Sequence, residues 1–189
     1  MTFSLYPYVT DTSSNEVLIT LLASFTIIYY ILRLVASNIL KGSGDIRSAL
    51  IYEFYGKNPT SAYLMDLLFI VSYFAVTIGI YQTGIFTQWL ATPVLRFFVI
   101  LVCVIIVLNI IVKFIADAMV GTRPSAHYIQ FFYKWGNAMG FWAMVWDCIY
   151  LGIIAILAFT LISFGLHNKI WITAGFWLAV TYYFLTISE

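Results

Sequence analysis

The chain has 189 residues, of which 63% are hydrophobic and 19% aromatic but only 9% charged. A soluble domain needs about 25% charged residues to wet its surface, so this composition excludes a soluble enzyme, a secreted disulfide-rich domain and a disordered protein. The formal net charge of +1 provides no basic excess that would attract nucleic acid. The sequence therefore predicts an integral membrane protein whose first partner is the lipid bilayer.

Apolar runs of membrane length follow an outer N-terminal tail of residues 1–16. A helix crosses a bilayer core about 30 Å thick with roughly 20 apolar residues. Five segments have this length and composition: Val17–Leu40, Ala62–Tyr81, Ala91–Ala116, Met139–Phe164 and Ile170–Ile187. We expect five membrane-spanning helices. A four-span arrangement that omits the last segment is the alternative.

Short amphipathic segments connect the first span to the second and the third to the fourth. The first is expected as a helix over about residues 45–55, with Asp45 as its N-cap. The second is expected over about 124–135, with Pro124 in its first turn. Mixed basic and aromatic residues of this kind lie at the level of the lipid headgroups. At the start of the fourth span, Gly136 and Gly140 form a GxxxG pattern, which is typical of closely packed helices.

Lysine and arginine residues are distributed unevenly between the two membrane faces. The seven on the side of the amphipathic segments are Arg33, Lys41, Arg47, Lys57, Lys113, Arg123 and Lys134, against only Arg96 and Lys169 on the other. Because cytoplasmic segments carry the excess of basic residues, we expect the amphipathic segments on the inner side. This orientation predicts an N-terminus that is outside or lumenal and a C-terminus that is inside.

Two parts of the chain resemble each other at an offset of about 80 residues. In both, a basic residue near the end of a span is followed by glycine, arginine, Ser-Ala, an aromatic cluster and an acid inside the next span. This order predicts two parallel hairpin repeats over 17–81 and 91–164, with the last helix (170–189) left over. The repeats would be related by a pseudo-two-fold axis along the membrane normal within one membrane domain. The expected fold class is thus an all-α integral membrane protein.

Ionisable residues inside the spans each need a physical explanation, because burying one in a bilayer costs a few kcal/mol. The repeat makes Arg33 and Asp66 correspond to Lys113 and Asp147. We expect each hairpin to be closed near its inner end by one such basic–acidic pair. The alternative is that Asp147, which lies deeper in its span, and Asp66 handle ions or protons.

Three further charged residues are secondary candidates. Glu16 and Arg96 occupy equivalent repeat positions at the outer ends of the first and third spans, and their opposite charges permit a contact. Asp117 lies toward the inner end of the third span.

Sequence signatures of catalysis are not found. The chain contains no H-E-x-x-H, C-x-x-C, G-x-S-x-G or P-loop pattern, and its two histidines, His127 and His167, are predicted on opposite membrane faces. We therefore expect no enzymatic activity, no metal site and no cofactor.

The function predicted from these features is that of a non-catalytic structural or accessory subunit. It would belong to a larger assembly, such as an organellar complex or a membrane-containing virion, with other subunits as partners. A small channel or carrier that uses Asp147 and Asp66 is the first alternative. A membrane enzyme that acts on lipid is the last, because only the interfacial aromatic residues favour it.

Overall fold

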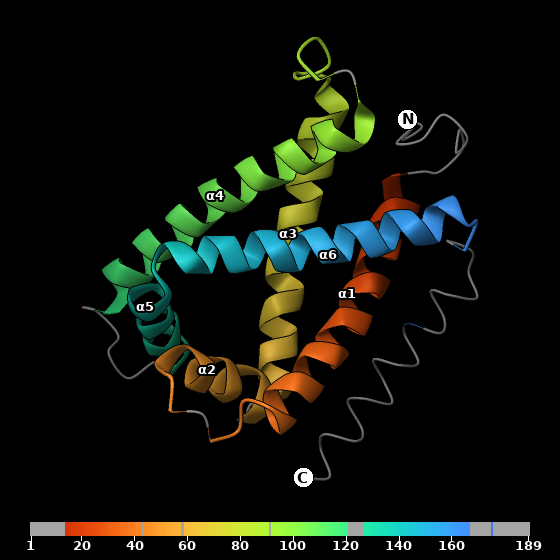
Figure 1. The fold of residues 1–189 in the computed structure, drawn as a ribbon. Coiled ribbons are helices and arrows are strands. Elements are labelled where there is room, and N and C mark those ends of the chain that lie inside the picture. Colours follow the sequence, from red (N-terminus) through yellow and green to blue (C-terminus); the bar gives the residue numbers. More distant parts are fainter. Residues whose placement is uncertain are drawn as a thin grey trace.

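Membrane-length helices form the body of the molecule. The structure, a computed structural model, describes residues 14–42, 44–57, 59–90, 92–120, 127–166 and 175. Within them, four helices are long and apolar enough to cross a bilayer: α1 (Ser14–Asn38), α3 (Pro59–Thr83), α4 (Pro93–Val120) and α6 (Phe141–Ser163). The shorter elements are α2 (Ile46–Ile51), the π-helical turn η1 (Tyr52–Lys57) and α5 (His127–Met139) (Figure 1). This architecture is that of a multi-pass membrane protein.

The four long helices correspond to the first four predicted spans, with ends that differ by a few residues. Residues 1–13 of the N-terminal tail, Pro124 and the fifth predicted span lie outside the described residues, except for Gly175. A Cβ atom placed on Gly175 would lie 3.1 Å from Cβ of Ala23, which is tighter than ordinary contact. Gly175 therefore lies directly against α1, in an approach that a larger side chain would obstruct.

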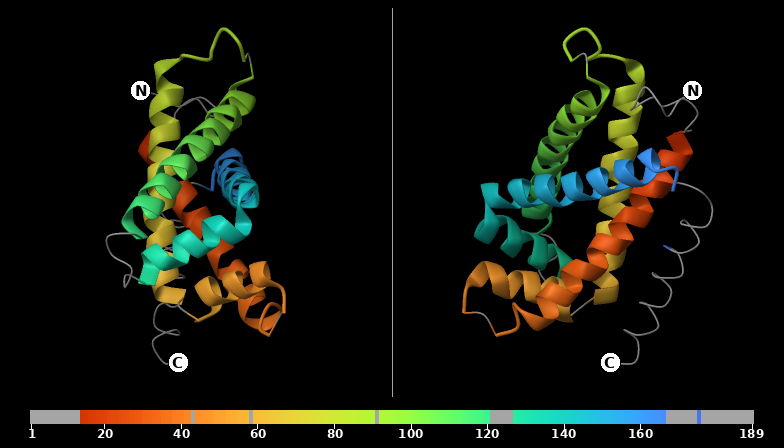
Figure 2. Two further views of the ribbon diagram at one scale, coloured as in Figure 1. Left: turned by 90° about the vertical axis from the view of Figure 1, so that its left-hand side faces the viewer. Right: turned by 45° about the vertical axis from the view of Figure 1, so that its right-hand side comes forward.

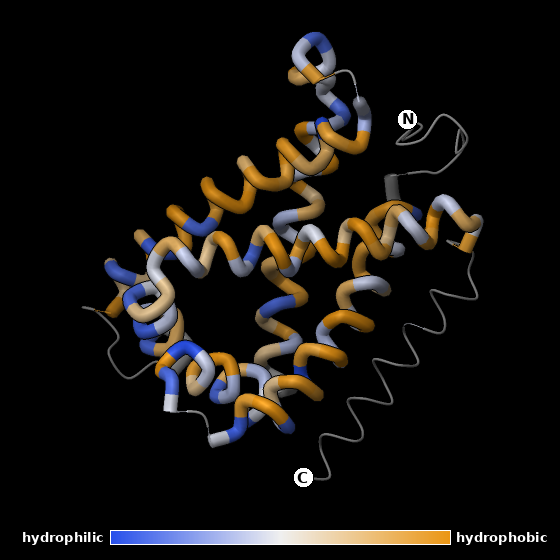
Figure 3. Tube along the Cα trace, in the orientation of Figure 1, coloured by the Kyte–Doolittle hydropathy of each residue, from blue (hydrophilic) through white to orange (hydrophobic). Residues whose placement is uncertain are grey.

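Both helical connections lie at the same end of the long helices. Figures 1 and 2 place α2, η1 and α5 together there, away from the loop 84–92 that joins α3 to α4. Contacts between α2 and α5 confirm that the connections meet. Hydrophilic residues are concentrated at this end, whereas apolar residues cover most of the long helices (Figure 3). The polar ends and apolar middle are the distribution that a bilayer requires.

The packing between helices has a pairwise regularity. Helix α1 packs against α6 and α3, whereas α4 packs against α3 and α6. The turn η1 packs against α1 and α3, and α5 packs against α4 and α6. The contacts of α1 thus resemble those of α4, the contacts of α3 resemble those of α6, and the contacts of η1 resemble those of α5. Helices α3 and α6 cross steeply in both Figure 1 and the right-hand view of Figure 2.

Large apolar side chains occupy both the interior and the outer surface. Phe25, Phe74 and Phe97 are fully buried between the helices. In contrast, Phe114 on α4 and Phe141 at the start of α6 are 75% and 71% exposed. Contact with lipid tails covers such residues without the cost they would have in water.

The first connection differs from the single helix expected over 45–55. Asp45 is the N-cap, as predicted, and its carboxylate accepts a hydrogen bond from the Ser48 amide at 2.9 Å. At Tyr52 the chain changes from α-helix to the wider π-helical turn. Leu50 and Phe54 are buried on either side of this change, whereas Ile46 at the start of α2 is 65% exposed.

The GxxxG pattern does not pack helices together in the described part of the chain, contrary to the expectation. A Cβ on either Gly136 or Gly140 would meet nothing within 4 Å. Gly140 instead ends α5 and starts α6, with a φ of +52° that L side chains rarely adopt. The second glycine of the pattern therefore forms the turn between α5 and α6.

Substitution of these two glycines should have opposite effects. Gly140→Ala should destabilise the protein by about 1–2 kcal/mol, because alanine is strained at positive φ. The matched control Gly136→Ala should leave stability unchanged or raise it by up to about 1 kcal/mol, because it removes a glycine from an open helical position. Thermal unfolding in detergent micelles measures both values. Equal destabilisation by the two substitutions would instead favour a helix-packing role.

The N-cap of α2 should weaken in acid. The hydrogen bonds from the Ser48 amide and hydroxyl lower the pKa of Asp45 below its ordinary value of 3.8. A carboxylate with a lowered folded-state pKa stabilises the fold above its unfolded pKa, and this contribution is lost as pH falls through the folded value. Hydrogen exchange of the Ser48 amide should therefore lose protection below about pH 4 relative to Asp45→Asn, whose amide oxygen caps without titrating. An identical pH dependence in that variant would contradict the assignment.

Candidate functional site

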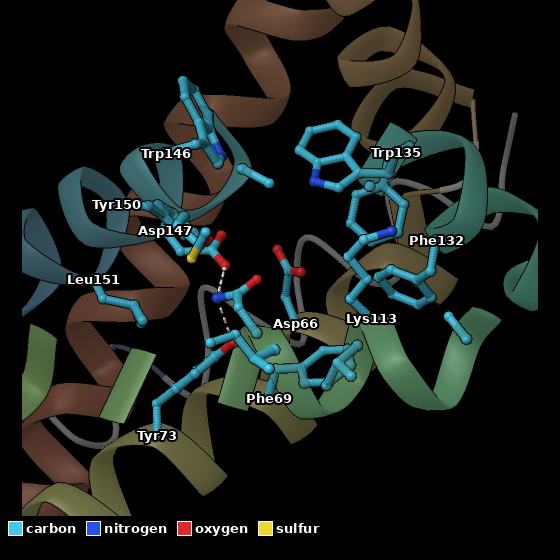
Figure 4. A pocket seen from close by; sticks show the side chains of 18 of the residues that line it. Asp66, Phe69, Tyr73, Lys113, Phe132, Trp135, Trp146, Asp147, Tyr150 and Leu151 are labelled. Atoms are coloured by element: carbon cyan, nitrogen blue, oxygen red, sulfur yellow. Dashed lines mark hydrogen bonds between the residues drawn. The ribbon is translucent and has the colours of Figure 1, made fainter. Parts of the chain in front are cut away.

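A cavity of about 360 Å³ lies between η1, α5 and the halves of α3, α4 and α6 that are nearest to them. We call it the acidic cavity, because Asp66 of α3 and Asp147 of α6 both line it. Figure 4 shows the carboxyl groups of Asp66 and Asp147 near each other in this cavity. Aromatic rings from α3, α5 and α6 surround them: Phe69, Phe132, Trp135, Trp146 and Tyr150. The fold therefore brings the two predicted intramembrane acids together.

Asp147 is held by an amide that connects three helices. The Asn109 Nδ2 group of α4 donates a hydrogen bond to Asp147 Oδ2 at 2.8 Å. The same group lies 3.2 Å from the Tyr73 hydroxyl oxygen on α3 and 3.1 Å from the Ile105 carbonyl oxygen. Because a buried charge is tolerated only with hydrogen-bond partners, Asn109 is the residue that makes Asp147 possible at this depth.

Asp66 has fewer partners than Asp147. Its Oδ2 atom is buried and has no hydrogen-bond partner among the described residues. The Tyr55 side chain of η1 forms a hydrogen bond with the Asp66 carboxyl group, and the charge of Asp147 acts on it as well. Burial raises the pKa of Tyr55 well above its usual range, and the neighbouring Asp66 charge raises it further. Tyr55 is thus a neutral hydrogen-bond partner for Asp66 at physiological pH.

Two other polar atoms of the cavity wall lack a partner among the described residues. Trp146 Nε1 and the Tyr150 hydroxyl are both buried without a hydrogen bond. Buried polar groups are rarely left unsatisfied, since each costs about 1–3 kcal/mol. A bound molecule or ordered water in the cavity would provide hydrogen-bond partners for these two atoms and for Asp66 Oδ2.

The predicted basic partners lie elsewhere. Lys113 lines the cavity, but its ion pair is with Asp117, one helical turn away, at 3.2 Å. Asp147 therefore has Asn109 rather than Lys113 as its partner, and the described partners of Asp66 do not include Arg33 of α1. The closure of each hairpin by one basic–acidic pair stays a prediction, and both acids line one cavity.

Arg96 and Glu16 lie near the ends of α4 and α1 that are away from the acidic cavity. Arg96 of α4 donates a hydrogen bond to the Tyr81 hydroxyl of α3 at 3.1 Å, and its guanidinium carbon lies 4.7 Å from the centre of that ring. Glu16 lies in the first turn of α1, where its carbonyl oxygen accepts a hydrogen bond from Thr20. The partner that the structure gives Arg96 is thus Tyr81, and the contact ties α3 to α4.

Asn109 is the site residue that sequence reasoning missed. It is an amide within a stretch of α4 where nearly every neighbour along the chain is aliphatic. Polar side chains are rare at such positions and commonly bond to another helix. That isolation was the signal which could have identified it, whereas its partner Asp147 could be found only from the fold.

The cavity has the chemistry to hold a cation. Two carboxylates, one amide and three phenols line it: Asp66, Asp147, Asn109, Tyr55, Tyr73 and Tyr150. In the part of the chain that the structure describes, no group of three His, Cys, Asp or Glu side chains is placed to hold a metal ion.

The Asn109–Asp147 hydrogen bond should appear as an energetic coupling. Asn109→Leu should destabilise the protein by about 1–3 kcal/mol, because Asp147 keeps its burial and loses its donor. In the double variant Asn109→Leu/Asp147→Leu, the loss should be smaller than the sum of the two single losses, because neither polar group remains. Denaturant unfolding in detergent micelles measures the cycle. Tyr73→Phe is the control that removes only the longer contact, and strictly additive losses would contradict the coupling.

No protein-family model, no curated protein and no solved structure matches this chain. A function for it therefore has to come from the residues that line the acidic cavity.

Proposed function

We propose that this chain is a small multi-pass carrier that binds a cation in the acidic cavity, with Asp66 and Asp147 as its binding carboxylates. The observation that carries the proposal is that both acids line one cavity while their described partners, Tyr55 and Asn109, are neutral. Carboxylates in a low-dielectric site are costly without a counter-charge. A bound cation supplies that counter-charge. Cation binding therefore explains why both acids lie in one cavity, which the closure of separate hairpins does not explain.

Internal symmetry supports the proposal. We propose that the two hairpins, α1–α3 and α4–α6, are parallel repeats, with α2–η1 equivalent to α5. When two copies are related by an axis, a residue can contact its equivalent in the other copy only if it lies near that axis. Phe54 and Phe131, which are equivalent in the sequence repeat, stack with ring centres 4.8 Å apart. The equivalent acids Asp66 and Asp147 share one cavity. Binding sites at the interface between repeats are typical of membrane carriers.

A carrier is favoured over an open channel because the outer half of the helix bundle is closely packed. Beyond Tyr73, the interior is filled by buried side chains of α3, α4 and α6: Phe74, Phe97, Leu101, Ile154 and Phe159. The Arg96–Tyr81 contact joins α3 to α4 at the outer end. A site that is closed off from one end of the bundle by packed side chains is expected for one state of alternating access.

The charge distribution supports a cytoplasmic opening. The cavity lies at the end that holds α2, η1 and α5, where most lysines and arginines of the sequence are found. By the positive-inside rule, we propose that this end faces the cytoplasm.

The structural-subunit role expected from the sequence is the competing proposal. Exposed apolar residues such as Phe114 and Phe141 would serve as contact surfaces for neighbouring subunits in such an assembly. Lipid covers the same residues equally well, whereas only cation binding uses the acids. The two proposals therefore differ in whether Asp66 and Asp147 are needed for anything besides folding.

Reconstituted vesicles test the carrier. Fluxes of H⁺, Na⁺, K⁺, Ca²⁺ and tetraethylammonium are measured across liposomes that contain the purified protein. At least one cation should cross faster than in protein-free liposomes, and Asp66→Asn and Asp147→Asn should each slow it roughly tenfold or more. The matched control Asp45→Asn should retain the flux, because Asp45 is an exposed cap of α2 and does not line the cavity.

Two results would overturn the proposal. One is a set of fluxes equal to those of protein-free liposomes for every cation. The other is equal transport by all three aspartate variants and the unchanged protein. Either outcome would leave the structural-subunit role as the better account.

A further inference from the structure

We infer that the cation of the acidic cavity is an organic ammonium ion with an apolar body, rather than a bare metal ion. The inference rests on the proposed function and names its class of substrate. Three properties of the cavity carry it: the size of the space, the nature of its walls and the supply of oxygen atoms.

The cavity is large for a dehydrated inorganic ion. Its volume of about 360 Å³ lies within the range of about 300–1,000 Å³ that is typical of small-molecule sites. Such a space accommodates a charged nitrogen together with its organic substituents. A bare ion would leave most of it to water.

The cavity wall is mainly aromatic and aliphatic. Rings of Phe69, Phe132 and Trp135 lie on one side of the carboxylates in Figure 4, and Trp146 and Tyr150 lie on the other. The electron-rich faces of Trp, Tyr and Phe attract ammonium groups, with Trp the strongest, and this attraction grows when water is excluded. Aromatic walls around a carboxylate therefore suit an organic cation.

The number of oxygen atoms near the carboxylates argues against a bare ion. Calcium takes six to eight oxygen ligands, and magnesium demands near-octahedral coordination. Here the described lining has two carboxylates, no group of three His, Cys, Asp or Glu side chains among the described residues is placed to hold a metal ion, and the Tyr73 hydroxyl oxygen already accepts a hydrogen bond from Asn109. An ammonium ion needs only a carboxylate and apolar contact, which Asp66 Oδ2 and the surrounding rings offer.

The net charge of the cavity selects for cations. Lys113 is the basic residue of the lining, and its ion pair with Asp117 offsets its charge. Asp66 and Asp147 therefore have no ion-pair partner within the described lining. An anion or a neutral lipid would leave them buried without a counter-charge.

The polar atoms of the cavity wall that have no hydrogen-bond partner among the described residues indicate that the ligand also carries a polar group. Trp146 Nε1 is a donor, and Figure 4 shows this nitrogen on the edge of the indole ring that is turned toward the cavity. The Tyr150 hydroxyl can donate as well. A ligand that carries an oxygen acceptor on its apolar body would satisfy these groups.

Binding measurements with benzyltrimethylammonium as the probe test the inference. Equilibrium dialysis of the detergent-solubilised protein should give saturable binding that Asp66→Asn or Asp147→Asn weakens tenfold or more and Asp45→Asn leaves unchanged. Trp135→Leu should weaken it roughly 5- to 30-fold, the equivalent of about 1–2 kcal/mol of cation–π attraction. Trp135→Phe should recover part of that loss, which shows that the variant series folds and that the ring itself is needed.

Trp89→Leu is the matched tryptophan control. Trp89 is 77% exposed in the outer loop 84–92 and does not line the cavity, so its replacement should leave probe binding unchanged. Parallel titrations with Na⁺, K⁺ and Ca²⁺ complete the set. These ions should compete with benzyltrimethylammonium only weakly, and their effect should not depend on Trp135.

The outcomes separate the inference from the proposed function. Binding of Na⁺, K⁺ or Ca²⁺ that requires Asp66 and Asp147, without binding of benzyltrimethylammonium, would overturn the inference and leave the carrier intact. Probe binding that is insensitive to Trp135→Leu would overturn the aromatic-wall argument. Failure of every cation to bind would overturn both the inference and the proposed function.

Discussion

The burial of two carboxyl groups within the membrane-spanning helices is the constraint on which the arrangement of this protein depends. An acid in the hydrocarbon region must find hydrogen-bond donors or a counter-charge, because lipid supplies neither. Asp147 finds Asn109, whose amide also contacts Tyr73, so that one side chain connects α3, α4 and α6. Asp66 finds Tyr55, which belongs to the interfacial turn η1. The acids thereby tie the long helices and the interfacial elements to the same cavity.

The interfacial elements contribute more than anchoring at the headgroups. The stack of Phe54 on Phe131 joins η1 to α5, and both residues line the acidic cavity. The change from α-helix to π-helical turn at Tyr52 accompanies the burial of Phe54 and Tyr55, and π-helical turns are frequent at functional sites. In the proposed carrier, movement of these elements would control access from the inner side without breaking a long helix.

Local sequence determined some charge contacts and not others. Lys113 and Asp117 are four residues apart on one helix, so their ion pair follows from helical periodicity alone. The expected pairing of Lys113 with Asp147 required two helices to present given faces to each other, and periodicity does not determine how a helix rotates about its axis within a bundle. Hydropathy gives little help with that rotation here, because the long helices are apolar on nearly all sides. The GxxxG pattern was misleading for a related reason, since its role depends on the positive φ of Gly140.

By itself, the sequence determined that this is a helical membrane protein, where the first four spans lie, that Asp45 caps an interfacial helix and that acids occur in the second and fourth spans. These features depend on bilayer thickness, local hydrogen bonding and the cost of burying charge, all of which act along a single stretch of chain. Only the tertiary structure decided that Asp66 and Asp147 share one cavity, that Asn109 is the partner of Asp147 and that aromatic rings from three helices surround the carboxylates. Those contacts join residues of different helices, and their geometry follows from how the helices cross and rotate as they pack.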